Sequence, residues 1–213
     1  MAFDDWVKEA ARRAGRAVDR AIKKYRDELV TDEDDLTGVL LGNLDAELQG
    51  KIGGLTWNSS ILRHRKGKAA QEKRIGADIL IHVVLATQNR SYSKGVLIQA
   101  KRCDKDALLT VKAHTELHDQ CTKMVSVSPS SFVFDYTRSG VRCGSAVRIA
   151  GSANRALYEE CTWTSYRFFQ ELFRCPIGDP AITSARVKDL PVPSVIQLRA
   201  KGEEPSLHSA RKV

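Results

Sequence analysis

Two apolar runs that follow each other closely constrain the fold of this chain more than any other feature. Residues 76–85 and residues 94–101 are both mostly apolar, and a polar segment at 87–93 separates them. Short runs of this kind are typical of β-strands that other layers cover on both faces. We therefore expect the two segments to be neighbouring strands inside a sheet that helices flank.

The rest of the chain supplies further elements for such a fold. Periodicity predicts strands at 55–62, 132–136 and 141–149 and helices at 115–125 and 163–173. After residue 180 strong periodicity ends, and Pro191, Pro193 and Pro205 interrupt the chain. The prediction is an α/β fold, a mixed β-sheet flanked by helices, with an N-terminal amphipathic helix at 1–30, a core at 31–179 and an irregular C-terminal extension at 180–213.

The helix predicted at 1–30 has one apolar and one basic face. Apolar side chains recur from Phe3 to Leu29 at steps of three and four, as one face of a helix requires. The opposite face carries Lys8, Arg12, Arg13, Arg16, Arg20, Lys23, Lys24 and Arg26. Two interpretations stay open: the solvated face of a packed helix, or a surface that follows a phosphate backbone or contacts another subunit.

The charge changes sign in the next segment. Residues 31–50 contain Asp32, Glu33, Asp34, Asp35, Asp45 and Glu47 but neither Lys nor Arg. Thr31 is a suitable N-cap for a helix here, and acidic side chains favour the positive end of a helix dipole. The acidic run at 32–35 exceeds what capping and the dipole require. This helix start is therefore a candidate contributor to a functional site.

A basic segment follows the strand predicted at 55–62. It includes Arg63, Arg65, Lys66, Lys68 and Arg74, in a chain of 213 residues with a formal net charge of +8. Such a loop either serves solubility or lies against a phosphate backbone without reading the base sequence. The second interpretation makes a nucleic acid the expected partner.

Several protein classes are disfavoured by what the sequence lacks. No apolar run approaches the ~18 residues that a membrane span needs, and the first residues lack the apolar core of a signal peptide. The five Cys residues are scattered without a Cys-x-x-Cys pair, which disfavours a disulfide framework and a Cys-rich zinc module. We therefore expect a cytoplasmic protein without a membrane partner.

Polar residues interrupt the two apolar strands at the ends that a hairpin would bring together. Asp78 opens the first strand, and Gln99 and Lys101 end the second and point to one face. Glu33 at the acidic helix start is a natural fourth member. Oxygen donors of this kind suit Mg²⁺, and a lysine beside them can orient or deprotonate a water molecule that attacks a phosphodiester.

At these residues the chain resembles the PD-(D/E)XK nuclease superfamily, which has the restriction-endonuclease-like fold. The motifs that carry the resemblance are Gly76-Ala77-Asp78, Gln99-Ala100-Lys101 and the helix segment Glu33-Asp34-Asp35-Leu36-Thr37, all within residues 30–137. The resemblance implies that Asp78 is the central metal ligand, Lys101 the catalytic lysine and Glu33 the helix acid. Gln99 stands where most members have Glu or Asp, and the carbonyl of Ala100 is a further implied ligand.

The resemblance also implies an activity and partners. The activity would be a Mg²⁺-dependent endonuclease, with Mn²⁺ as a substitute, that cuts DNA and leaves a 5′-phosphate; RNA stays open as a substrate. Cutting two strands takes two active sites, so a homo-oligomer is expected. The absence of a separate target-recognition segment favours an effector nuclease of a bacterial anti-phage defence or restriction system, controlled by a partner protein.

Two alternatives remain at this stage. The chain could be a non-catalytic nucleic-acid-binding or assembly module that keeps the nuclease fold, and Gln99 supports this because an amide binds Mg²⁺ less strongly than a carboxylate. His114, His118 and Cys121 share one helix face and form a conceivable zinc site, although such trios are more often metal-free. Gln120 on the same helix is a candidate for approaching Asp78, and His82 is expected to be a buried core residue.

Overall fold

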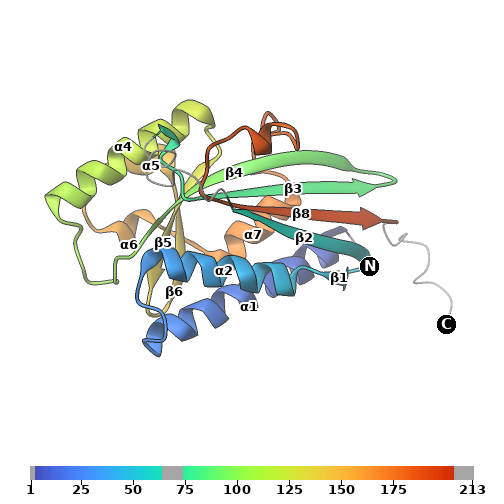
Figure 1. Cartoon of the computed structure of the whole chain (residues 1–213), viewed down its shortest axis with the longest axis horizontal. Helices are drawn as coiled ribbons and strands as arrows, with labels where there is room; N and C mark the ends of the chain where they lie inside the picture. Colours follow the sequence, from blue (N-terminus) through green and yellow to red (C-terminus); the bar gives the residue numbers. More distant parts are fainter. Residues whose placement is uncertain (1–2, 64–73, 204–213) are drawn as a thin grey trace.

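An eight-stranded mixed β-sheet organises the chain in a computed structural model, which describes residues 3–63 and 74–203 (Figure 1). In the described part of the chain the strand order is β1-β2-β8-β3-β4-β5-β6-β7. The strands are β1 (Gly50–Ile52), β2 (Leu55–Arg63), β3 (Ile79–Thr87), β4 (Ser91–Lys101), β5 (Ser131–Thr137), β6 (Gly140–Ser145), β7 (Trp163–Thr164) and β8 (Ser194–Gly202). The helices are α1 (Phe3–Arg26), α2 (Glu33–Glu47), α4 (Val111–Val127), α5 (Ala146–Ala150), α6 (Leu157–Glu160), α7 (Ser165–Arg174) and the 3₁₀ helix η1 (Arg186–Lys188).

The two apolar runs form the antiparallel hairpin that their composition predicts. β3 pairs with β4, with Ile79 opposite Ile98, and most side chains of both strands are buried. β4 then pairs with β5 in parallel, which sets Gln99 opposite Val133 and Lys101 opposite Asp135. The α/β architecture with a mixed sheet flanked by helices is confirmed.

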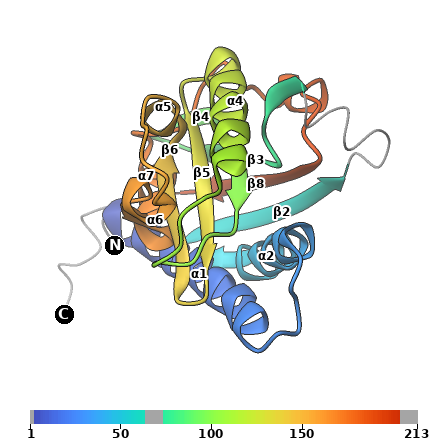
Figure 2. The ribbon, with the colours of Figure 1, turned by 90° about the vertical axis from the view of Figure 1, so that its left-hand side faces the viewer.

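Helices cover both faces of this sheet (Figures 1 and 2). α1, α2 and α7 bury one apolar cluster, in which the ring of Trp57 lies 6.0 Å from that of Trp6 and 5.2 Å from that of Phe173. α4 and α5 cover the other cluster, with Leu117 and Cys121 fully buried. Side chains that alternate along β3, β4 and β5 therefore face two different cores, which explains why these strands are apolar on both sides.

The prediction for the C-terminal segment is wrong over 194–202. This segment forms β8, which lies in the middle of the sheet, antiparallel to β2 and parallel to β3. Pro191 and Pro193 precede the strand, where they remove no ladder hydrogen bond, and Val195, Ile196 and Leu198 are fully buried. The core expected to end at residue 179 thus includes β8, while residues 204–213 lie outside the described part of the chain.

Smaller differences concern element boundaries. The strand predicted at 141–149 ends at Ser145, where α5 begins, and the helix predicted from Trp163 begins at Ser165 after the short strand β7. Helix α2 is capped by Asp32 rather than by Thr31, because Asp32 Oδ1 accepts hydrogen bonds from the backbone amides of Asp34 and Asp35. No helix in the described ranges is long and apolar enough to cross a membrane.

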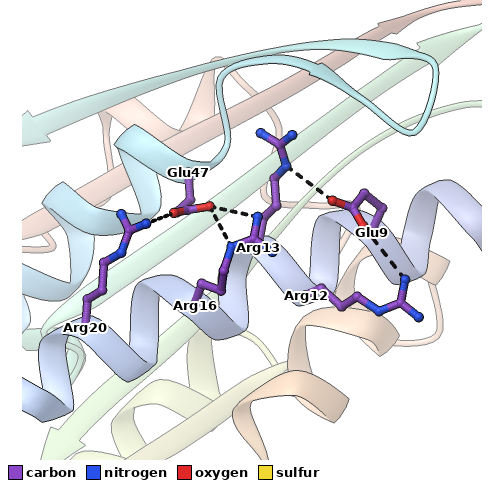
Figure 3. A network of polar contacts seen from close by, with 6 residues as sticks. All are labelled: Glu9, Arg12, Arg13, Arg16, Arg20 and Glu47. Atoms are coloured by element: carbon purple, nitrogen blue, oxygen red, sulfur yellow. Dashed lines mark hydrogen bonds and ion pairs between the residues drawn. The ribbon is translucent and has the colours of Figure 1, made fainter.

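The basic face of α1 is held by two glutamates of the same chain (Figure 3). The carboxylate of Glu47, at the end of α2, is buried and lies 2.6 Å from a guanidinium nitrogen of Arg20 and 3.1 Å from one of Arg16. A second glutamate nearer the N-terminus pairs with two further arginines. The apolar face of α1 is buried at the same time, so the helix is packed into the core.

Candidate functional site

Asp78 and the end of β4 meet at one edge of the sheet, as the hairpin predicts. The Asp78 amide donates to the carbonyl of Ile98, which fixes this residue at the start of β3. Its Oδ2 atom accepts hydrogen bonds from Gln99 Nε2 at 2.5 Å and from the Ala100 amide at 2.9 Å. Asp78, Gln99 and Ala100 therefore form one hydrogen-bonded unit at the base of the site.

The amide group of Gln99 lies between two oxygen acceptors. Gln99 is fully buried, and its Nε2 donates to the Ala100 carbonyl at 3.0 Å as well as to Asp78. Its Oε1 is buried, and no donor in the described part of the chain reaches it. The nitrogen thus occupies the space between a carboxylate and a carbonyl, and half a turn of the amide would put an oxygen there instead.

Glu33 lies above Lys101 at the N-terminus of α2. The distance from Lys101 Nζ to Glu33 Oε1 is 3.9 Å, and both side chains are partly buried. Burial raises the pKa of the Glu33 carboxyl and the charge of Asp34 adds to this, while Lys101 and Arg102 act in the opposite direction. The predicted helix acid and the predicted lysine are therefore neighbours.

A buried hydrogen bond fixes the first turns of α2 above the sheet. Thr37 Oγ1 and the hydroxyl of Tyr136 lie 3.0 Å apart, and both side chains are buried. Burial raises the pKa of the Tyr136 hydroxyl, and the charges of Asp78 and Glu33 raise it further. The hydroxyl of Tyr136 is thus close enough to Asp78 and Glu33 for the charges of both carboxylates to affect its pKa.

Asp135 is a residue of the site that sequence reasoning missed. It lies on β5 opposite Lys101, is fully buried, and accepts a hydrogen bond from the Cys103 amide at 2.9 Å through Oδ1. Burial raises its pKa to about 7, and the charges of Asp104 and Glu33 contribute. The signal available in the sequence was a single acid among the apolar and aromatic residues at 132–136.

Helix α4 approaches the site through Gly76. This glycine has φ +78, and a Cβ atom there would lie 2.4 Å from the carbonyl oxygen of Gln120, so the position excludes a side chain. The side-chain oxygen of Gln120 is buried without a donor among residues 3–63 and 74–203. The structure therefore brings Gln120 close to the segment that leads into Asp78.

Three buried oxygens without a donor gather on residues around Asp78 and Lys101. Across the described ranges, the buried side-chain oxygens that lack a hydrogen bond are Gln99 Oε1, Gln120 Oε1 and Asp135 Oδ2. Buried acceptors are normally satisfied, and each exception calls for an explanation. A bound cation is one such explanation, because it interacts favourably with acceptors and needs no donor.

The oxygen donors at this edge of the sheet are of the chemical type that a hard cation binds. Asp78, the Gln99 amide and the Ala100 carbonyl offer oxygens next to each other, and Glu33 adds a second carboxylate beside Lys101. Mg²⁺ sites in proteins use one or two carboxylates together with waters and substrate oxygens. Within the described residues, no three His, Cys, Asp or Glu side chains are grouped so that they could hold a metal ion.

The other predicted residues are less well connected to this site. Arg65, Lys66 and Lys68 lie outside the described residues, as does the side chain of Arg63, the last residue of β2; Arg74 is exposed. The rings of His114 and His118 are tilted to each other with their centres 4.3 Å apart, but in the described ranges they form no metal cluster with Cys121. His82 is buried as predicted, with Nε2 3.0 Å from Ser93 Oγ.

Comparison of the chain with models of protein families, with curated proteins and with solved structures finds no match. The functional interpretation therefore depends on the contacts around Asp78, Gln99 and Lys101 and on the sequence motifs that contain them.

Proposed function

We propose that this protein is a Mg²⁺-dependent endonuclease that hydrolyses phosphodiester bonds in DNA. The observation that carries the proposal is the unit formed by Asp78, Gln99 and Ala100, in which a buried amide group separates a carboxylate from a carbonyl. Lys101 and Glu33 border this unit. These are the residue types that metal-dependent phosphodiester hydrolysis requires.

Each residue has a distinct role in this proposal. Asp78, Gln99, the Ala100 carbonyl and Glu33 would hold the Mg²⁺ ion. When bound, such an ion supplies an activated water and neutralises charge on the phosphate. Lys101 orients the attacking water through its ammonium group and offsets the negative charge that develops on the phosphorus oxygens.

The charge of the chain and the resemblance suggest the substrate and the partners. The net charge of +8 and the basic segment from Arg63 to Arg74 favour a polyanion such as DNA. The same charge suits RNA, so both substrates belong in the assay. A homo-oligomer that cuts both strands, and control by a partner protein of a bacterial defence system, are part of the proposal through the resemblance alone.

The test is strand cleavage by the purified protein with Mg²⁺, with Mn²⁺ and with EDTA. We expect metal-dependent nicking of supercoiled plasmid, and Lys101→Ala should lower its rate about 10²–10⁴-fold, the usual contribution of a positioned acid–base group. Lys123→Ala is the matched control, because Lys123 pairs with Asp119 on the exposed side of α4. Equal nicking by wild type and Lys101→Ala would contradict the assignment of the site.

A second candidate function has one specific observation in its favour. Gln99 Nε2 donates to Asp78 Oδ2, so the carboxylate is already occupied by a hydrogen bond. A protein that never binds metal would keep this bond permanently, and the fold would then serve as a nucleic-acid-binding or assembly module.

Thermal unfolding separates the two candidates. At a Mn²⁺ concentration 100-fold above its Kd, the Tm of a metal-binding protein should rise by about 5–10 °C. Asp78→Asn should abolish this rise, whereas Asp119→Asn on the surface of α4 should retain it. An identical response of wild type and Asp78→Asn would favour the non-catalytic module.

A further inference from the structure

Asp135 is buried between two basic residues, yet it forms a hydrogen bond with neither. In the sheet it lies opposite Lys101 of β4 on one side and opposite Arg142 of β6 on the other. Its Oδ1 is satisfied by the Cys103 amide, while no donor in the described part of the chain reaches Oδ2. A fully buried carboxylate with one oxygen that accepts no hydrogen bond lowers the stability of the fold, so the presence of this carboxylate calls for an explanation.

The two basic neighbours are engaged elsewhere, but not equally firmly. Arg142 donates to the carbonyls of Cys161 and Thr162 at 2.9 and 3.2 Å, and its guanidinium also lies over the ring of Tyr158. Lys101 has a looser contact, 3.9 Å from Glu33 Oε1. Of the two cations, the lysine is therefore the one that can change partner.

Geometry allows Lys101 to reach Asp135. Residues opposite each other on neighbouring strands are about 5 Å apart, and their side chains stand on the same face of the sheet. A lysine has a flexible four-carbon stem that ends in a compact ammonium group. The Lys101 ammonium can therefore turn from Glu33 to the unsatisfied oxygen of Asp135 without movement of the backbone.

We propose that Asp135 is a positioning residue for Lys101, which receives the ammonium group when a divalent cation engages Glu33. This inference rests on the proposed function, because it makes Glu33 a metal ligand. Without the cation, Glu33 holds Lys101 away from its working position. With the cation, Asp135 Oδ2 fixes Lys101 beside the attacking water, and Asp135 itself contacts neither metal nor substrate.

Other charged and titratable groups around Asp135 must be considered in any test. They are Lys101, Cys103 and Asp104 on and after β4, Arg142 and Cys143 on β6, Glu33 on α2, Cys121 on α4 and Cys161 after α6. Burial raises the pKa of the four thiols, which keeps them neutral. A change in the titration of Asp135 therefore does not come from the charge of a thiol.

The variant Glu33→Gln removes the carboxylate that holds Lys101, as a bound cation would, so the proposal can be tested without metal and without cleavage. The readout is the titration of the Asp135 carboxyl carbon by ¹³C NMR, assigned by its absence in Asp135→Asn. We expect Lys101→Met to raise the Asp135 midpoint by at least about one unit in the Glu33→Gln background, because it removes the new partner, and by much less in wild type. An effect of equal size in both backgrounds, or none, would overturn the proposal.

The rate of DNA cleavage provides a second test of the role of Asp135. Asp135→Asn should lower the rate at saturating Mg²⁺ about tenfold or more, leave the Mg²⁺ concentration for half-maximal rate unchanged, and have no further effect in Lys101→Ala. A raised Mg²⁺ requirement would make Asp135 a metal ligand and overturn the proposal. If wild type does not cleave at all, the proposed function fails, and the NMR titration still decides the role of Asp135.

Discussion

Buried carboxylates of two kinds coexist in this protein. Glu47 and Glu160 are almost completely buried, and each has charged or polar partners: Glu47 contacts Arg16 and Arg20, and Glu160 accepts bonds from Arg148 and Ser152. Asp135 is buried as deeply but retains an oxygen without a donor within the described residues.

The two kinds of buried carboxylate differ in whether they stabilise the fold or await a further partner. A buried charge that is fully paired serves the fold, since removing either partner leaves the other uncompensated. A buried carboxylate that is left incomplete costs stability, and proteins keep such groups mainly where a ligand or a moving partner completes them. Glu47 and Glu160 thus belong to the first kind, and Asp135 belongs to the second.

The largest expected difference between the proposed site and the paired carboxylate Glu47 is in cleavage. Asp78→Asn removes a proposed metal ligand and should lower the rate of plasmid nicking about 10²-fold or more. Glu47→Gln removes an equally buried carboxylate at the opposite end of α2 from Glu33 and should leave the rate of the folded protein unchanged. Comparable losses in both variants, measured below their Tm, would remove the distinction.

The next effect is on stability and its dependence on pH. Burial gives Asp135 a pKa of about 7 in the folded state, above the usual value of 3.8. The contribution of Asp135 to the free energy of unfolding is therefore fully present below pH 3.8. It is lost as the pH rises through 7, because the folded state disfavours the charged carboxylate.

Asp135→Asn should accordingly stabilise the protein at pH 8, by on the order of 1–3 kcal/mol, and flatten the pH dependence between pH 4 and pH 7. Asparagine keeps an oxygen that can accept from the Cys103 amide, so the fold is retained. Urea unfolding at pH 5 and pH 8 measures both effects. Destabilisation at pH 8 would show that the carboxylate is satisfied in solution.

Glu47→Gln should have the opposite sign at the same pH. It leaves Arg16 and Arg20 beside a neutral amide, and we expect a loss of about 1–2 kcal/mol, limited because both guanidinium groups are about half exposed. Urea unfolding in low and in high salt measures this loss. A stabilising effect would show that Glu47, like Asp135, is a buried carboxylate that costs stability.

The smallest effect is expected for Glu9 on α1. Glu9 pairs with Arg12 and Arg13 at 3.8 and 3.5 Å, but these side chains remain partly exposed to solvent. Glu9→Gln should change the free energy of unfolding by less than about 0.5 kcal/mol, and added salt should reduce the change further. A loss as large as that of Glu47→Gln would mean that burial does not separate the two glutamates.

The sequence predicted the part of the site that depends on local pattern. Two apolar runs joined by a short polar segment can pair as a hairpin, and alternation then sets Gln99 and Lys101 on the face of Asp78. The acidic start of α2 was likewise visible as a run of carboxylates that exceeds the needs of a helix cap. In these cases the relevant residues are close in sequence or carry a clear periodicity.

What the sequence did not predict depends on contacts between distant segments. β8 reaches the centre of the sheet by pairing with β2 and β3, more than 100 residues earlier in the chain, and the prolines before it concealed the apolar pattern. The register between β4 and β5, which brings Asp135 opposite Lys101, joins two strands that the whole of α4 separates in the chain, so no local pattern predicts it. The orientation of the Gln99 amide depends on its buried neighbours and cannot be read from the motif.

The most direct test is anomalous scattering from crystals grown with Mn²⁺. We expect an anomalous peak between Asp78 Oδ2 and the Ala100 carbonyl, with the oxygen of the Gln99 amide turned toward it and Glu33 drawn away from Lys101. The absence of a peak there, at a Mn²⁺ concentration that saturates any effect on Tm, with Gln99 Nε2 still donating to Asp78, would contradict this expectation.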